Sequence, residues 1–287
     1  MALRFLVVEG NTRADRERHA SVFGLSPADG YAQEIRRIAP DAVCDIAFPA
    51  DEGANLPDAG GLEGYDAVVL TGSALNLYDM TPPILRQIAL MRAVYASGTP
   101  AFGSCWGIQV GAAAAGGSVV RNPRGIEVGF ARRIVRTQAS AGHPLLDGRP
   151  AAFDAPAIHL DIVETLPEGA LVLAHNAMAG VQAAEFAHAG GRFWGVQYHP
   201  EFSLPELAAY LARYGGRLVA AGLCADEAAA ARYADEIATL GRDPSRRDLA
   251  WAHGVDAEVL DPDRRTREIR NFVEARVRPT KSARGRA

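Results

Sequence analysis

The sequence has few cysteines and no long hydrophobic run. Its three cysteines (Cys44, Cys105 and Cys224) are an odd and sparse set, which argues against a disulfide framework and suits a reducing cytosol. No apolar run approaches the roughly 20 residues needed to cross a bilayer. The apolar part of the opening MALRFLVVEG is too short for a secretory signal. We therefore expect a cytoplasmic protein with no membrane segment.

Several motifs that bind ligands are also missing. No CxxC or HExxH spacing is present, so no metal site is expected. No GxxxxGK or GxGxxG loop is present, so no phosphate-bearing cofactor is expected either. The formal net charge of −4 gives no reason to expect nucleic acid or an anionic membrane as a partner.

The residues that are present fit a globular chain with a sizeable core, since 48% are hydrophobic and 22% are charged. In the first half, runs typical of buried strands alternate with runs typical of helices. The strand-like runs are 3–8, 42–48, 66–72 and 99–103, and the helix-like runs are 30–39 and 82–98. This alternation predicts an α/β fold with a doubly wound, mostly parallel sheet, which binds ligands beyond the carboxyl ends of its strands.

The second half has a different pattern. Residues 117–200 predict a series of strands with short turns, which would extend the sheet in a mixed or antiparallel way. From Ser203 helices return, and SLPE predicts a capping box between Ser203 and Glu206. We assign residues 1–217 to the main domain, 218–278 to a helical C-terminal extension and 279–287 to a basic, disordered tail.

The segment PAFGSCWGIQ, residues 100–109, places Cys105 where a strand is expected to pass into a helix. Gly103 and Gly107 would permit a tight turn and a close approach of substrate to the sulfur. A helix beginning at Trp106 would favour the thiolate and offer the Trp106 N–H to an oxyanion. Cys105 is therefore a candidate nucleophile, although the local pattern also fits a small buried residue, as we expect for Cys44 and Cys224.

A thiol nucleophile needs a histidine to accept its proton and a group to orient the imidazole. WGVQYHPEFS, residues 194–203, supplies His199 and Glu201 at the end of an apolar strand. Because these residues are two apart, an extended backbone would point both side chains to one face. His159 and Asp161 in IHLD repeat this spacing, and the spacing alone does not choose between the two pairs.

GSCWGIQ resembles the G-x-C-x-G-x-Q motif of class I glutamine amidotransferases, and GVQYHPE resembles their closing H-P-E motif. VVLTGSALNLYD, residues 68–79, is similar to a strand-end segment that usually reads T-G-G-P-x-S-V-Y-D, although Ser73 and Ala74 replace the usual Gly-Pro. IHLDIVETLP resembles a segment of the branch that includes the amidotransferase domain of GMP synthase. The resemblance covers about residues 3–203.

The resemblance implies a flavodoxin-like fold and hydrolysis of the side-chain amide of glutamine or of a γ-glutamyl amide through a γ-glutamyl thioester. It favours His199 over His159 as the general base. His159 and Asp161 then either face the mouth of the pocket or complete a strand pair. The implied site consists of a catalytic set (Cys105, His199, Glu201), oxyanion donors (Trp106, and Gly72 or Ser73) and a substrate pocket (Gln109, with His159 and Asp161 as candidates).

A glutaminase domain normally supplies ammonia to a synthase, but the sequence contains no ATP-binding motif that would indicate a synthase domain. We therefore favour a stand-alone hydrolase. The alternatives are a glutaminase subunit that delivers ammonia to a separate synthase and a non-catalytic binding module, which the intact set of Cys, His and Glu disfavours. The expected partners are glutamine or a γ-glutamyl small molecule, with a synthase subunit or a second copy of the chain as further candidates.

Overall fold

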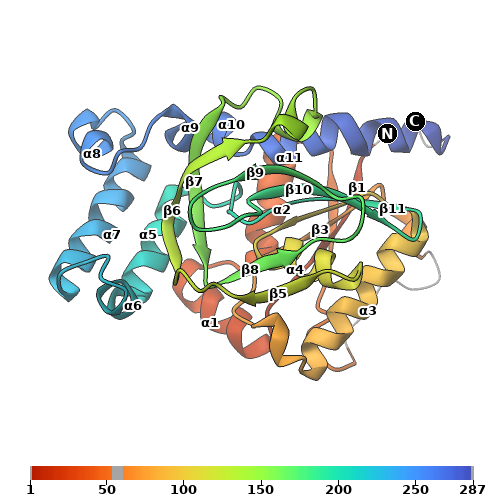
Figure 1. Ribbon diagram of the computed structural model, residues 1–287, viewed down its shortest axis with the longest axis horizontal. Helices are drawn as coiled ribbons and strands as arrows, with labels where there is room; N and C mark the ends of the chain where they lie inside the picture. The colour runs from red at the N-terminus through yellow and green to blue at the C-terminus, as the bar shows by residue number, and fades with distance from the viewer. Residues whose placement is uncertain (1, 54–60, 286–287) are drawn as a thin grey trace.

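The computed structural model describes residues 2–53 and 61–285. In this part of the chain, a nine-stranded sheet has the order β2-β1-β3-β4-β11-β10-β9-β6-β7, and a small second sheet pairs β5 with β8 (Figure 1). The strands are β1 Arg4–Val8, β2 Val43–Ala47, β3 Ala67–Leu70, β4 Ala101–Ser104, β5 Ser118–Arg121, β6 Glu127–Arg136, β7 Ala152–His159, β8 Asp161–Thr165, β9 Leu171–His175, β10 Ala183–His188 and β11 Gly191–Val196.

Helices connect the parallel strands and make up the whole C-terminal part. The α-helices are α1 Arg13–Phe23, α2 Pro27–Ile38, α3 Pro82–Ser97, α4 Trp106–Ala114, α5 Leu204–Arg213, α6 Gly215–Ala220, α7 Glu227–Arg242, α8 Arg247–Ala252, α9 Ala257–Leu260, α10 Pro262–Arg265, α11 Arg267–Phe272 and α12 Arg278–Ala283. Short 3-10 turns are η1 Leu62–Gly64, η2 Leu77–Asp79, η3 Gln138–Ser140 and η4 Pro144–Leu146, and η5 Val273–Val277 is a π-helical segment.

The sheet has a parallel part and an antiparallel part. Strands β2, β1, β3, β4 and β11 pair in parallel, whereas β10, β9, β6 and β7 pair antiparallel to their neighbours. All four residues of β3 are buried, as expected for a strand covered by helices on both faces. Helix α2 packs on one face, and α3 and α4 pack on the other. The predicted α/β fold with a mixed extension of the sheet is therefore confirmed.

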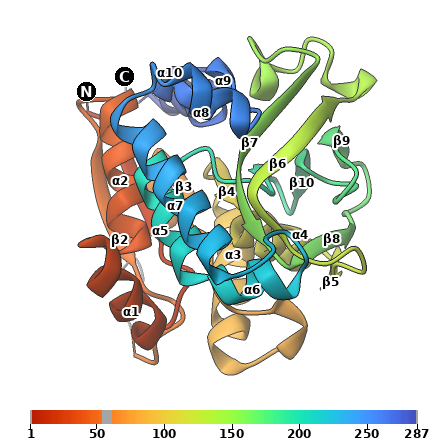
Figure 2. The same ribbon diagram turned by 90° about the vertical axis from the view of Figure 1, so that its left-hand side faces the viewer.

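The C-terminal helices do not form a unit apart from the sheet. Helix α7 packs against α5 beside the long hairpin of β6 and β7 (Figure 2). The chain then returns along one edge of the molecule toward its N-terminus (Figure 1). On this return path Ile269, Phe272 and Val273 join the same apolar cluster as Phe5 and Tyr31. Residues after 217 thus complete the core of the main domain.

The basic C-terminal segment differs from its prediction. Residues Arg278–Ala283 form helix α12, where we expected a disordered tail from residue 279. The reason is that its positive charge has partners: the Lys281 ammonium donates to Asp66 Oδ2 at 2.9 Å and to the Ala2 carbonyl at 2.6 Å. The last two residues of the predicted tail, 286 and 287, lie outside the described residues.

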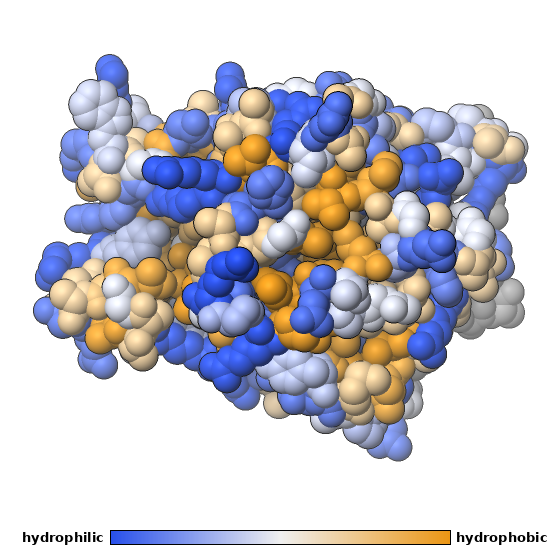
Figure 3. Space-filling model, viewed as in Figure 1, coloured by the Kyte–Doolittle hydropathy of each residue, from blue (hydrophilic) through white to orange (hydrophobic). Residues whose placement is uncertain are grey.

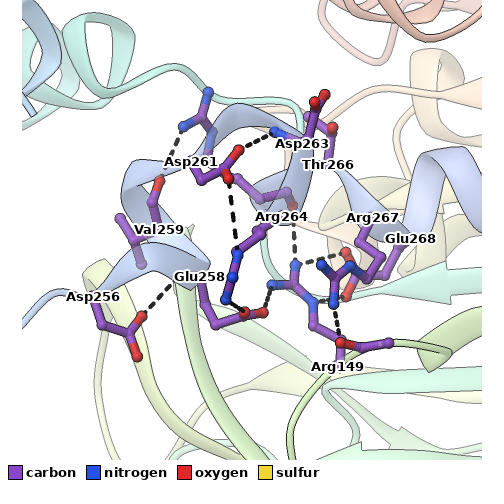
Figure 4. A network of polar contacts seen from close by, with 12 residues as sticks. Arg149, Asp256, Glu258, Val259, Asp261, Asp263, Arg264, Thr266, Arg267 and Glu268 are labelled. Atoms are coloured by element: carbon purple, nitrogen blue, oxygen red, sulfur yellow. Dashed lines mark hydrogen bonds and ion pairs between the residues drawn. The ribbon is translucent and has the colours of Figure 1, made fainter.

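A buried ion-pair network fastens the extension to the sheet (Figure 4). The Arg149 guanidinium, which is fully buried, donates twice to the Glu268 carboxylate at 2.8 Å and once to Glu258 at 2.8 Å. Glu268 also accepts a hydrogen bond of 2.8 Å from the hydroxyl of Tyr198, the residue before His199. The extension therefore contacts the segment that carries one of the expected site residues.

A second charged cluster surrounds Glu185 on β10. Its carboxylate accepts hydrogen bonds from Trp194 Nε1 and Arg192 Nη1, both at 2.7 Å, and lies 2.5 Å from His143 Nε2. Arg276 in the extension adds a contact at 3.2 Å. Burial alone would raise the pKa of Glu185, but the hydrogen bonds from His143 and Trp194 and the positive charge of Arg276 lower it to about 2.

We expect Glu185→Gln to lower the free energy of unfolding at about pH 7 by about 2–3 kcal/mol. A carboxyl whose pKa is depressed on folding stabilises the protein above its unfolded pKa and loses this effect as pH falls through its folded pKa. The difference between wild type and variant should therefore shrink as pH falls from about 4.5 toward about 2. Urea unfolding across this pH range measures the difference in the free energy of unfolding. A difference that does not vary with pH would contradict the lowered pKa of Glu185.

The surface mixes apolar and charged side chains, and Figure 3 shows apolar atoms gathered near the centre of one face. Among the exposed apolar residues, Trp251 on α8 is the most accessible at 79%. No helix among the described residues has both the length and the apolar character needed to cross a membrane.

Candidate active site

Several expected site residues follow the carboxyl ends of adjacent parallel strands. Gly72 comes just after β3, Cys105 directly after β4 and His199 shortly after β11, and Gly10, which was not among the predicted site residues, comes just after β1. Because β1, β3, β4 and β11 are neighbours that run in one direction, these ends meet at a single edge of the sheet. This is where open parallel sheets bind their ligands.

Cys105 occupies a strained turn between β4 and α4. Its backbone has φ 51° and ψ −101°, a region that residues with a side chain rarely adopt and that costs about 1–3 kcal/mol. The backbone N–H of Cys105 donates to the Val196 carbonyl at 2.8 Å, and its thiol lies 3.5 Å from the Ile158 carbonyl. The first N–H groups of a helix have no acceptor within that helix, so the N–H of Trp106, the first residue of α4, is not used by the helix itself.

Close backbone approaches explain the glycines of this turn. A Cβ on Gly103 would lie 2.6 Å from the backbone of Gly107, and a Cβ on Gly107 would lie 2.8 Å from the Leu70 carbonyl oxygen. A Cβ on Gly72 would lie 2.7 Å from Cε1 of His199. The absent side chains thus let β3, β4, α4 and the histidine ring come together around Cys105.

His199 and Glu201 form a buried pair. His199 Nδ1 lies 2.7 Å from Glu201 Oε1, and the His199 ring stacks on Phe202 with centroids 3.9 Å apart. Burial alone would lower the pKa of the imidazole, but the charge of Glu201 and the nearby Cys105 sulfur raise it to about 10. Strand β11 ends at Val196, so the pair meets in the following turn rather than on an extended strand as predicted.

The turn after β3 is held by polar residues that follow β1. Asn11 Oδ1 accepts the Ala74 N–H at 3.0 Å, and the Ser73 hydroxyl donates to the Gly10 carbonyl at 2.9 Å. Glu9 is fully buried and accepts from the Asn11 side chain at 2.9 Å. Glu9 and Asn11 were not among the predicted site residues, although polar residues directly after a buried strand are a signal for this edge of the sheet.

His159 and Asp161 do not form a second pair of the His199–Glu201 kind. His159 Nε2 lies 2.8 Å from Glu127 Oε2, and the Asp161 carboxylate instead accepts from the Tyr78 hydroxyl at 3.2 Å. Gln109 on α4 donates to the Asp161 backbone carbonyl at 3.1 Å. The structure thus groups Gln109, His159 and Asp161 along a hollow that reaches Cys105.

Glu206 was expected only as a helix cap. Ser203 Oγ accepts the Glu206 N–H at 3.3 Å, so the first half of the capping box is present. The Glu206 carboxylate instead lines a cavity that also contacts Cys105 and His199. Burial and the negative charge of Glu201 raise the pKa of Glu206 to about 7.

The remaining cysteines lie away from the site. Cys44 is on β2 and Cys224 lies between α6 and α7, and both are only half-buried rather than core residues. Across the described ranges, no cluster of three His, Cys, Asp or Glu residues has a geometry that would hold a metal ion.

Comparisons with known proteins bear on the family and the fold of the chain. The family model for glutamine amidotransferase class-I matches residues 42–214. A gamma-glutamyl-L-1-hydroxyisopropylamide hydrolase of Pseudomonas sp is 36% identical over 97% of this chain and 94% of that protein. A GMP synthase of Leifsonia xyli subsp. xyli is 32% identical over 67% of this chain, but the match spans only 37% of that protein.

Solved structures show the same fold. A glutamine amidotransferase from Thermotoga maritima matches with a TM-score of 0.65 at 19% identity, over 96% of this chain and 99% of that one. A glutamine amidotransferase from Methylobacillus Flagellatus matches with a TM-score of 0.63 at 16% identity, over 94% and 96% of the two chains. The chain therefore belongs to the class I glutamine amidotransferase family and is an enzyme of the type that hydrolyses amide C–N bonds.

Proposed function

We propose that this protein hydrolyses γ-glutamyl amides without a partner, with Cys105 as nucleophile, His199 as general base and acid, and Glu201 as the group that orients His199. The observation that carries this proposal is that a thiol on a strained turn and a buried His–Glu pair at 2.7 Å line one cavity. The raised pKa of His199 fits a histidine stabilised as imidazolium beside a thiolate.

The reaction has two halves. The Cys105 thiolate attacks the amide carbon, and the Trp106 N–H, with an N–H of Gly72 or Ser73, stabilises the oxyanion. As the C–N bond breaks, the His199 imidazolium gives its proton to the leaving nitrogen. The imidazole then takes a proton from water, whose oxygen attacks the γ-glutamyl thioester, and glutamate leaves as the thiolate and imidazolium re-form.

The γ-glutamyl part would lie on the side of Cys105 that carries Gln109, His159 and Asp161. This hollow also contains Arg18 and Arg217, whose guanidinium groups suit an α-carboxylate. The Asp161 side chain offers an acceptor for an α-ammonium group. His159 acts here as part of the wall, held by its contact with Glu127.

The similarity to the Pseudomonas hydrolase supports independent action because it extends over 97% of this chain, including the helical extension. A glutaminase subunit of a two-chain synthase is the second candidate. It is favoured by the 32% identity to a glutamine-hydrolyzing GMP synthase subunit of Methanoculleus marisnigri, over 51% of this chain and 71% of that one. Since the extension packs into the core of the main domain, we prefer the stand-alone hydrolase.

Glutamate release by the purified chain tests the proposal. We expect release from γ-glutamyl ethylamide without ATP or any added protein, and a higher kcat/KM for this compound than for glutamine. Release from glutamine alone would favour the glutaminase subunit. No release from either compound would overturn both candidate functions. Cys224→Ala, which changes a thiol remote from the site, is the matched control and should retain the wild-type rate.

A further inference from the structure

Cys105 lies at the boundary between two hollows. One is lined by Gln109, His159 and Asp161 and has a volume of ≈ 320 Å³. The other lies between α1, α2 and α5 and includes His199 and Glu201 in its wall. It has a volume of ≈ 80 Å³, room for about five water-sized groups. The two hollows share Cys105 and six further wall residues, among them Asp15, Ser73 and Arg213, so one substrate can extend into both.

The reaction requires one orientation of such a substrate in the two hollows. The leaving nitrogen must come within hydrogen-bond reach of His199, which gives it a proton. His199 lines the smaller hollow and is absent from the wall of the larger one. The amine half of the substrate therefore points into the hollow between α1, α2 and α5, hereafter the amine cavity.

The amine cavity has acceptors in its wall. Glu201 Oε1 contacts His199, whereas Glu201 Oε2 is buried and has no hydrogen-bond partner among the described residues. Glu206 lies in the same wall, with its side chain 23% exposed. A further hollow of ≈ 410 Å³ adjoins the cavity through Glu201 and Glu206 and adds Glu34.

The other charged and titratable groups leave these acceptors available. Asp15 also lines the cavity, but its carboxylate accepts from the Thr12 hydroxyl at 2.9 Å and lies 3.3 Å from Arg18 Nη1. His19 Nε2 lies 3.9 Å from Glu206 Oε1, but burial and the nearby charge of Arg213 lower the pKa of His19 to about 4, so it is neutral near pH 7. Arg213 lines both hollows, whereas Arg265 is buried outside the lining and interacts with Glu206 only through its charge. Aromatic rings of Phe202 and Tyr210 supply the apolar part of the cavity.

We propose that the amine cavity selects γ-glutamyl amides whose amine carries a hydrogen-bond donor, a hydroxyl or an ammonium group, and that Glu206 and Glu201 Oε2 accept from that donor. The inference rests on the proposed function, since it requires a γ-glutamyl amide at Cys105. A short amine fits the cavity, and a longer one reaches the adjoining hollow. Glu206 is then the residue that determines specificity for the leaving amine.

Three amides of equal size test the proposal with the full chain: γ-glutamyl propylamide, γ-glutamyl 2-hydroxyethylamide and γ-glutamyl 2-aminoethylamide. In the wild type, kcat/KM for at least one donor-bearing amide should exceed that for the propylamide by at least about tenfold. In Glu206→Leu, this ratio should fall by at least about tenfold, because the apolar side chain accepts no hydrogen bond. Melting curves and circular dichroism establish that the variant is folded.

A second variant distinguishes a hydroxyl donor from an ammonium donor, and it keeps the proposal testable if Glu206→Leu does not fold. Glu206→Gln keeps the size and an acceptor oxygen but removes the charge. Retained preference for the hydroxyethylamide identifies a hydroxyl-bearing amine, and loss confined to the aminoethylamide identifies an ammonium-bearing one. Glu17, an exposed residue of α1, serves as matched control, since Glu17→Gln should leave every ratio at its wild-type value.

Two outcomes would overturn the inference. One is a wild type that cleaves the propylamide as well as both donor-bearing amides. The other is a Glu206→Leu enzyme in which all three rates change by one common factor. Either result leaves the proposed function intact, because Cys105-dependent cleavage would still occur. Failure to cleave any γ-glutamyl amide would instead reject the proposed function itself.

Discussion

Replacement of Cys105 by alanine is expected to lower kcat by about 10⁴-fold or more, because no covalent intermediate can then form. The fold should persist, since alanine keeps the Cβ and the hydrogen bond of the sulfur to the Ile158 carbonyl is weak. Glutamate release under single-turnover and steady-state conditions measures the loss. Substantial turnover by Cys105→Ala would refute the assignment of the nucleophile.

The backbone at Cys105 offers an independent check on the same variant. Its φ of 51° is unfavourable for any residue with a side chain, so Cys105→Gly should be more stable than Cys105→Ala while being equally inactive. His199→Ala should be nearly as inactive as Cys105→Ala, since residues that act as a unit show similar losses when removed singly. A double variant should then lose little more than either single one.

The second large effect concerns stability. Arg149→Met is expected to lower the free energy of unfolding by about 3–5 kcal/mol, because Glu268 and Glu258 would lose the buried cation that compensates them. Glu258 keeps a contact with Arg264 at 3.1 Å, so most of the cost should arise at Glu268. Urea unfolding followed by circular dichroism measures the change.

The double variant Arg149→Met with Glu268→Leu should recover much of the lost stability, since an apolar pair can replace a buried ion pair of similar volume. The Tyr198 hydroxyl would still lose Glu268 as its hydrogen-bond acceptor, so the variant should also carry Tyr198→Phe, which removes that hydroxyl. The exposed pair of Arg246 and Asp248 is the matched control, and Asp248→Asn should change stability little. Equal stability of wild type and Arg149→Met would show that the network contributes nothing.

Features with a local cause could be predicted from the sequence. The turn at Cys105 follows from small residues within a few positions of the thiol, and the contact of His199 with Glu201 joins residues two apart. The strand positions follow from buried apolar runs. Each of these features depends on residues that are close together along the chain. In the structure, the strand-to-helix turn at Cys105 and the contact of His199 with Glu201 lie close to the predicted positions.

Features that depend on distant residues could not be predicted. The His159 ring faces Glu127 because β6 and β7 pair in one register, which the spacing of His159 and Asp161 does not reveal. Helix α12 is ordered because Lys281 meets Asp66, 215 positions away in sequence. Glu206 faces a cavity whose wall includes residues of α1 and α2. The SLPE pattern predicted its position at the start of a helix but not this cavity.

The packing of Phe272 has a consequence for synthesis of the chain. Its ring lies 5.5 Å from that of Phe102 on β4 and 6.0 Å from that of Trp194 on β11. Part of the apolar face of β4 and β11, beside the area that α2 covers, therefore stays uncovered until residue 272 has left the ribosome. During that interval the nascent chain should be a client of chaperones that bind apolar surfaces, and the proposed site around Cys105 should mature only after translation of the extension.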